Sequence, residues 1–134
     1  MLIGTDVKIP LVLSTVAAGF PSPADDFIDK KLDLNQLIIK HPVATFFVHA
    51  AGNSMIKAGI NDGDLLVVDR SIKPDNEDII IAVVDGEMTV KRLRQVGEAI
   101  YLVPENPDYK AIKISADTDF QVWGTVTYVI SKKA

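Results

Sequence analysis

An Asp-Gly pair at positions 85 and 86 separates two mostly apolar runs, and this pattern constrains the fold more than any other stretch of the chain. The first run spans 79–84 and the second spans 88–93. Asp-Gly suits the two-residue turns of β-hairpins, in which both central positions take a positive φ. The pattern therefore predicts two antiparallel strands that are joined at Asp85-Gly86.

Similar short runs, separated by turn residues, recur from residue 43 onward. A turn at 61–63 precedes one of them, and the last run shows the period-2 alternation of a strand. Short strands with turn signals between them predict a compact, mostly antiparallel β domain. The predicted strands cover 45–50, 64–69, 78–84, 88–93, 99–103 and 120–130.

The N-terminal part of the chain has a different pattern. Prolines at 21 and 23 predict extended backbone within an arm over 1–28, because each proline fixes its own φ and restricts the residue before it. A short helix is predicted over 32–39, since Asp33 can cap its start. The predicted domains are an arm with this helix over 1–40 and a β core over 41–134.

The composition argues against several classes of function. A chain of 134 residues suits one domain with a modest core. The net charge of −4 argues against direct sequence-specific DNA binding, which needs a basic surface. Neither a membrane span nor a secretory signal is predicted. The chain has no cysteine, which removes disulfides and thiolate metal sites. We expect a cytoplasmic protein with no cofactor and no metal.

Ser54 lies in a stretch that can place a serine hydroxyl beside free backbone N–H groups. Gly52-Asn53 is a predicted turn, and 54–58 is a predicted helical turn that ends at Gly59. A serine there is either a helix N-cap or a nucleophile beside amides that stabilise an oxyanion. The amides expected in that second role are those of Ser54 and Met55.

A serine nucleophile needs a base, and Lys91 is the leading candidate. Strand alternation places Thr89, Lys91 and Leu93 on one face. If that face points inward, desolvation lowers the pKa of the Lys91 amine and makes it a usable base. The alternative is that Lys91 is a solvated lysine at a strand edge.

Four other residues are weaker candidates for the base. Lys57 lies one helical turn after the serine, where we expect an exposed and charged amine. Arg92 cannot serve, because a guanidinium keeps its proton in proteins. His41 and His49 leave a Ser-His pair open, but the sequence marks no aspartate oriented toward either of them.

The blocks around Ser54 and Lys91 together resemble the self-cleaving LexA/UmuD family. The Gly-Phe-Pro-Ser-Pro sequence at 19–23 narrows the resemblance to the UmuD-like branch. The resemblance runs along nearly the whole chain. The matching segments are 18–24, 32–37, 52–55, 59–60, 62–69 and 85–93.

The resemblance implies a LexA-like β fold and a Ser-Lys autoprotease. Ser54 matches the nucleophile, Lys91 matches the general base, and Ala18–Gly19 matches the bond that is cut. In the family, a RecA–single-stranded-DNA filament stimulates this cleavage during the SOS response to DNA damage. The trimmed form, here 19–134, is implied to be a homodimer that serves a UmuC-like Y-family polymerase in error-prone translesion synthesis.

Departures from the wider family narrow the function further. The residues before Ala18–Gly19 are too few for the winged helix-turn-helix domain of a LexA-like repressor, so we expect no direct operator binding. Two other functions stay open on the residues alone. One is a non-enzymatic dimeric binding module that regulates a polymerase, and the other is a protease that acts on other proteins in trans.

Overall fold

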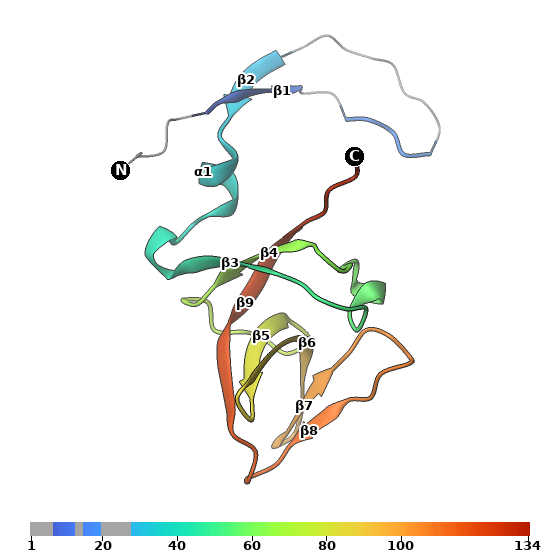
Figure 1. Cartoon of the computed structure of the whole chain (residues 1–134). Coiled ribbons are helices and arrows are strands. Elements are labelled where there is room, and N and C mark those ends of the chain that lie inside the picture. The colour runs from blue at the N-terminus through green and yellow to red at the C-terminus, as the bar shows by residue number, and fades with distance from the viewer. Residues whose placement is uncertain (1–6, 13–14, 20–27) are drawn as a thin grey trace. The chain divides into compact units, whose positions relative to one another are not determined.

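The structure is a computed structural model that describes residues 7–12, 15–19 and 28–134, with the backbone alone for 28–30 (Figure 1). Within these ranges strands predominate over short helices, which confirms the predicted mostly β fold. The chain divides into two compact units between Lys40 and His41. No helix in the described ranges is long and apolar enough to cross a membrane.

The N-terminal unit contains a small antiparallel sheet and a short helix. β1 (Ile9–Val12) pairs with β2 (Ile28–Leu32), and α1 (Leu34–Ile38) follows. The carboxylate of Asp33 accepts the backbone N–H of Asn35 at 2.9 Å. The predicted helix and its N-cap are therefore confirmed, with the helix shorter than expected.

The pairing of β1 with β2 was not predicted from the sequence. Proline removes a backbone donor and is confined to sheet edges, and Pro10 stands within β1. Both strands of a two-stranded sheet are edges, so the proline is tolerated there. The extended backbone predicted around the prolines at 21 and 23 lies outside the described residues.

The second unit is built on one seven-stranded sheet whose neighbouring strands are all antiparallel. Its strand order is β3-β4-β9-β5-β6-β7-β8. The sequence pattern predicts each of these strands except β8, which is too short to show a pattern. The strands are β3 (Thr45–His49), β4 (Leu65–Asp69), β5 (Ile79–Val84), β6 (Glu87–Val96), β7 (Ala99–Val103), β8 (Ile112–Ile114) and β9 (Phe120–Ile130).

Strands β5 and β6 form the predicted hairpin. Val84 pairs with Glu87, and between them Asp85 and Gly86 have φ values of 48° and 84°. Positive φ at both positions is the two-residue turn that Asp-Gly favours. The same register places Lys91 opposite a residue of β5 that is fully buried, Ile80.

The long strand β9 joins the two halves of the sheet (Figure 1). Its C-terminal part pairs with β4, and its N-terminal part pairs with β5. A Cβ added at Gly124 would lie 2.6 Å from Val68 Cγ1 and 3.1 Å from the backbone oxygen of Asp69. Glycine is therefore required where β9 passes from one partner strand to the other.

Buried apolar side chains form two clusters on this sheet. The second cluster lies on β5 and β7 and consists of Ile80, Ala82 and Leu102. The first lies over β4 and includes residues on both sides of the Ser54 turn, which anchors that turn in the core. It consists of Ala50, Met55, Ile60, Leu66, Val68 and Ile81.

Candidate active site

A pocket of about 190 Å³ lies between the end of β3 and the first half of β6. Residues 48–51 form one side and residues 88–91 form another. Ser54, Leu66 and Ile81 complete the lining. The pocket therefore brings together the two residues, Ser54 and Lys91, that the sequence analysis singled out.

Ser54 lies in a turn that precedes the 3₁₀ helix η2 (Ile56–Ala58). Gly59 ends this helix with a φ of 80°, as predicted. The N-cap residue is Met55 rather than Ser54, and no side chain caps the helix. The interpretation of Ser54 as a helix cap is therefore wrong, and its hydroxyl has a different partner.

That partner is Lys91 of β6. Its Nζ lies 3.1 Å from Ser54 Oγ, and it donates to Thr89 Oγ1 at 2.8 Å and to the Val90 carbonyl oxygen at 3.1 Å. Burial disfavours the ammonium form and lowers the pKa of Lys91 below its ordinary value. Lys91 is half-buried on a strand that lies between β5 and β7, so the alternative of a solvated lysine at a strand edge is wrong.

These three contacts suit a neutral amine. The Val90 carbonyl only accepts hydrogen bonds, and the Thr89 hydroxyl can accept one. The N–H bonds of a neutral Lys91 can be directed at these two oxygens. The lone pair of Nζ then faces the Ser54 hydroxyl, which is the arrangement needed to remove its proton.

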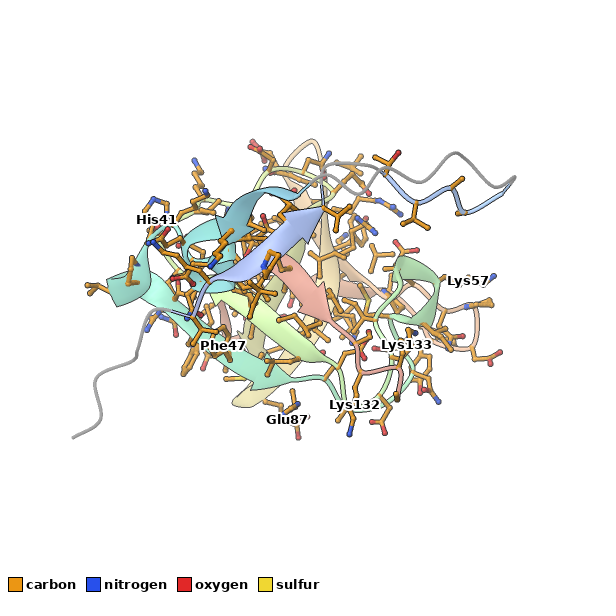
Figure 2. All side chains as sticks on the ribbon, turned by 90° about the horizontal axis from the view of Figure 1, so that it is seen from above. His41, Phe47, Lys57, Glu87, Lys132 and Lys133 are labelled. Atoms are coloured by element: carbon orange, nitrogen blue, oxygen red, sulfur yellow. The ribbon has the colours of Figure 1, made fainter. Side chains whose placement is uncertain are left out.

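The other candidate bases have different surroundings. Lys57 is exposed, as expected, and projects from the surface of the second unit (Figure 2). Arg92 is partly buried and donates its Nε–H to the carboxylate of Glu105 at 2.5 Å. His49 lines the pocket, where its Nδ1 lies 3.2 Å from the carbonyl oxygen of Gly63.

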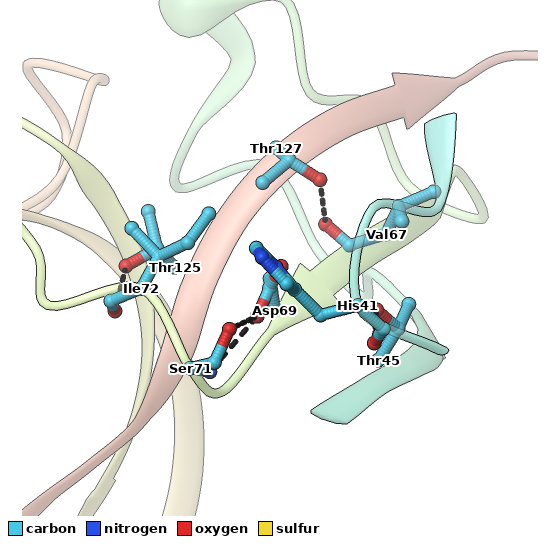
Figure 3. A network of polar contacts seen from close by, with 8 residues as sticks. All are labelled: His41, Thr45, Val67, Asp69, Ser71, Ile72, Thr125 and Thr127. Carbon is cyan, nitrogen blue, oxygen red and sulfur yellow. Dashed lines mark hydrogen bonds and ion pairs between the residues drawn. The ribbon is translucent and has the colours of Figure 1, made fainter. Parts of the chain in front are cut away.

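His41 has an aspartate partner that the sequence analysis did not identify (Figure 3). Its Nδ1 lies 2.6 Å from Asp69 Oδ2, and the Ser71 hydroxyl donates to Asp69 Oδ1 at 2.6 Å. In a catalytic triad the serine bonds to the histidine, whereas Ser71 bonds to the carboxylate. We interpret this cluster as structural, because it ties the first residue of the second unit to the end of β4.

The electrostatics of Asp69 agree with a structural role. Only 3% of Asp69 is exposed. Burial alone raises the pKa of its carboxyl group, but hydrogen bonds from Ser71 and His41 outweigh that effect and hold the pKa below its ordinary value. Asp69 is therefore a satisfied buried carboxylate.

The predicted scissile bond, Ala18–Gly19, belongs to the N-terminal unit. Both residues are exposed and form a bend in the chain. The structure thus brings the predicted nucleophile and base together in one unit, and the predicted bond is part of the other.

Three further residues of the site, in addition to the serine and the lysine, were not identified from the sequence. Thr89 contacts the lysine, the Glu105 N–H donates to the Ser54 carbonyl oxygen at 2.8 Å, and Asn106 Nδ2 donates to the Asn53 carbonyl oxygen at 2.8 Å. Thr89 was detectable, because strand alternation already put it on the face of the lysine. Glu105 and Asn106 lie far from the serine in sequence and carry no local signal.

Comparison with known proteins identifies the family of this chain. The model of the Peptidase S24-like family matches residues 10–127. Protein SamA of Salmonella typhimurium is 48% identical over 92% of this chain and 85% of its own length. Protein ImpA of Escherichia coli is 45% identical over 92% of this chain and 83% of its own length. LexA repressor 1 of Xanthomonas campestris is 42% identical over 90% of this chain and 60% of the repressor.

The fold and the pocket define a β-sheet protein of the serine peptidase class. The family match covers most of the sequence, including Ser54 and Lys91, and the chain belongs to the Peptidase S24-like family. The predicted resemblance to the UmuD-like branch is confirmed by SamA and ImpA. The chain is an SOS mutagenesis protein.

Proposed function

We propose that this chain is a self-cleaving serine endopeptidase that cuts its own Ala18–Gly19 bond. Ser54 is the nucleophile and Lys91 is the general base. The observation that carries the proposal is the 3.1 Å contact between Lys91 Nζ and Ser54 Oγ in the pocket. A lysine activates a serine only as a neutral amine, and the burial of Lys91 favours that form.

The proposed reaction passes through an acyl-enzyme. Lys91 Nζ takes the proton of Ser54 as Oγ attacks the carbonyl carbon of Ala18. The tetrahedral intermediate then collapses, the bond to the Gly19 nitrogen breaks, and Lys91 gives its proton to that nitrogen. A water molecule that loses a proton to Lys91 next attacks the ester, which releases the Ala18 carboxylate and restores the serine.

The backbone N–H groups of Ser54 and Met55 are the proposed donors to the oxyanion. Within the described residues neither group donates to a backbone acceptor, whereas the next two do. The Ile56 N–H donates to the carbonyl oxygen of Asn53, and the Lys57 N–H donates to the carbonyl oxygen of Glu105. Ser54 lines the pocket, and N–H groups of this turn that have no backbone acceptor are available to stabilise the negative charge that develops on the Ala18 oxygen.

The role in the cell is proposed from the UmuD-like relatives. A RecA–single-stranded-DNA filament stimulates the cleavage. The trimmed chain, 19–134, forms a homodimer that acts in the cytoplasm as accessory subunit of a UmuC-like error-prone translesion polymerase. The net charge of −4 supports action through protein partners rather than through direct contact with DNA.

The direct test is self-cleavage of the purified chain at alkaline pH, and then with activated filament at neutral pH. Mass spectrometry should find a fragment that starts at Gly19. The Ser54→Ala chain should remain intact under both conditions, because it lacks the nucleophile. A fragment from the Ser54→Ala chain would contradict the assignment of Ser54 as the nucleophile, since cleavage would then have another origin.

A mixing experiment distinguishes cleavage within one chain from cleavage of one chain by another. The Ala18→Glu chain keeps both catalytic residues but should resist cleavage, because a bulky charge replaces a small residue beside the bond. Mixed with Ser54→Ala, it forms product only if one chain cuts another. A wild-type chain that is folded and dimeric, but never yields the fragment, would instead support the non-enzymatic binding module.

A further inference from the structure

We propose that the loop 104–109 positions the oxyanion donors, with Asn106 as the positioning residue. This inference rests on the proposed function, because it concerns the same serine. β7 ends at Val103, and the chain that follows it lies beside the Ser54 turn. Two adjacent residues of this loop, Glu105 and Asn106, bond to two adjacent carbonyls of that turn.

Those two carbonyls control the direction of the two proposed donors. Asn106 Nδ2 holds the Asn53 carbonyl at 2.8 Å, and the Glu105 N–H holds the Ser54 carbonyl at 2.8 Å. A peptide unit is planar, and in a trans unit its N–H points opposite to its C=O. No peptide bond of the described residues is cis. Holding the Asn53 carbonyl therefore aims the Ser54 N–H, and holding the Ser54 carbonyl aims the Met55 N–H.

The loop is in turn fixed to the strand that carries the base. Arg92, the residue after Lys91, donates Nε–H to the Glu105 carboxylate and an Nη1–H to the Glu77 carbonyl, each at 2.5 Å. The side chains of Arg92 and Glu105 are only 23% and 28% exposed, so this pair is less screened than an ordinary surface ion pair. The Glu105 carbonyl also accepts the Lys57 N–H at 2.9 Å. One loop residue thus contacts both the serine turn and the strand of the lysine.

A substitution at Asn106 can test the positioning role, because the oxygen and the nitrogen of its side-chain amide bond to different partners. Its Oδ1 accepts the Asp108 N–H at 2.9 Å within the loop, while its Nδ2 donates to Asn53. The substitution Asn106→Asp keeps an acceptor for Asp108 and nearly the same size, but it removes the donor. The variant therefore breaks the contact with the serine turn and spares the contact inside the loop.

The experiment compares the pH profile of self-cleavage in Asn106→Asp and in the unaltered chain. Loss of a direct oxyanion donor lowers kcat by about 10² to 10³, and a misdirected donor should lose part of that. We expect the plateau rate to fall about 10-fold to 100-fold, with the midpoint of the profile unchanged because Lys91 sets it. Asn106→Gln, which keeps a donor, should recover part of the rate.

Two controls separate positioning from charge and from folding. Gln121→Glu makes the same amide-to-acid change at an exposed position of β9 and should leave the plateau rate unchanged. In the Ala18→Glu background, adding Asn106→Asp should lower the NMR order parameters of the residue 54 and 55 amides and spare those of β6. The thermal midpoint should stay near that of the unaltered chain.

Three results would overturn the inference. One is an unchanged plateau rate, another is a shifted pH midpoint, and the third is unchanged order parameters at residues 54 and 55. Each of them leaves the proposed self-cleavage standing, because the unaltered chain still yields its fragment. An unaltered chain that yields no fragment overturns the proposed function and the catalytic role of the loop together.

Discussion

As the proposed general base, the half-buried amine of Lys91 should set the pH dependence of self-cleavage. Below its pKa, the neutral fraction of an amine rises tenfold with each pH unit, and above the pKa it saturates. Burial lowers the pKa of Lys91 from the value of about 10.4 that is ordinary for lysine. The rate of self-cleavage should therefore rise with pH, reach half its plateau below about pH 10.4, and then level off.

Initial rates of fragment formation, measured across this range, check the prediction. Lys91→Arg stays charged and should give no fragment at any pH at which the chain remains folded. Lys57→Arg is the matched control at an exposed position and should keep the normal profile. Activity that falls with rising pH, or that survives in Lys91→Arg, would assign the base to another group.

Thr89 should affect the rate through the orientation of the amine. Its hydroxyl accepts a hydrogen bond from Lys91 Nζ at 2.8 Å and thereby helps to turn the lone pair toward Ser54. Thr89→Val keeps the shape but removes this acceptor. Loss of one hydrogen bond of about 1 kcal/mol should slow self-cleavage about 5-fold to 10-fold at the plateau.

Thr89→Ser retains the hydroxyl and serves as the control for Thr89→Val. Its plateau rate should stay close to that of the unaltered chain, measured in the same pH series. Equal rates for the valine and serine variants would mean that the hydroxyl does not orient the amine.

At the scale of the elements, local patterns predicted individual strands well and their neighbours in the sheet poorly. The β5–β6 hairpin followed from Asp85-Gly86, because the turn chemistry and the pairing lie within one short stretch. The position of β9 between β4 and β5 depends on contacts between residues far apart in sequence, which no local pattern encodes. β8 has three residues, and alternation over such a length is not distinguishable from a loop.

The site, too, depends on contacts between residues that lie far apart in sequence. Ser54 and Lys91 lie 37 residues apart. Strand alternation made Lys91 the leading candidate for the base, and the family resemblance then favoured the pair over the interpretation of Ser54 as a helix cap. The pairing of His41 with Asp69 spans 28 residues and had no such resemblance behind it, so it was missed. Asn106 was missed for the same reason, since it bonds to a carbonyl 53 residues away.

Gly124 tests whether β9 needs a residue without a side chain where it changes partner. In Gly124→Ala the new Cβ would meet Val68 Cγ1 at 2.6 Å and the Asp69 backbone oxygen at 3.1 Å. The methyl of Val68 can turn aside, but the backbone of β4 cannot, so the strands must separate slightly. We expect a loss of about 1–3 kcal/mol in the free energy of unfolding, measured by urea denaturation.

The double variant Gly124→Ala/Val68→Ala separates the two contacts. It removes the side chain that lies nearest the new Cβ and leaves the backbone contact in place. If the valine clash dominates, the double variant should be less destabilised than the sum of the two single variants. A Gly124→Ala chain as stable as the unaltered one would show that β9 has room at this point.

At the scale of the whole molecule, the proposed cut falls between two strands that pair with each other. β1 precedes Ala18 and β2 follows Gly19, so cleavage breaks the covalent connection between the two strands. Every strand of the seven-stranded sheet lies after the cut. Cleavage should therefore change the N-terminal unit and leave the fold of the core intact.

We predict that the peptide 1–18 leaves the chain after cleavage. Four residue pairs join β1 to β2, and a two-stranded sheet of this size is marginal even when its strands are linked. Once the link is cut, the pairing must also overcome the loss of translational freedom on association. Size-exclusion chromatography should separate the peptide from the fragment 19–134, and the amides of β2 should exchange faster than in the uncleavable Ala18→Glu chain. A peptide that co-elutes with the fragment, with β2 still protected, would show that contacts beyond the β1–β2 ladder hold it in place.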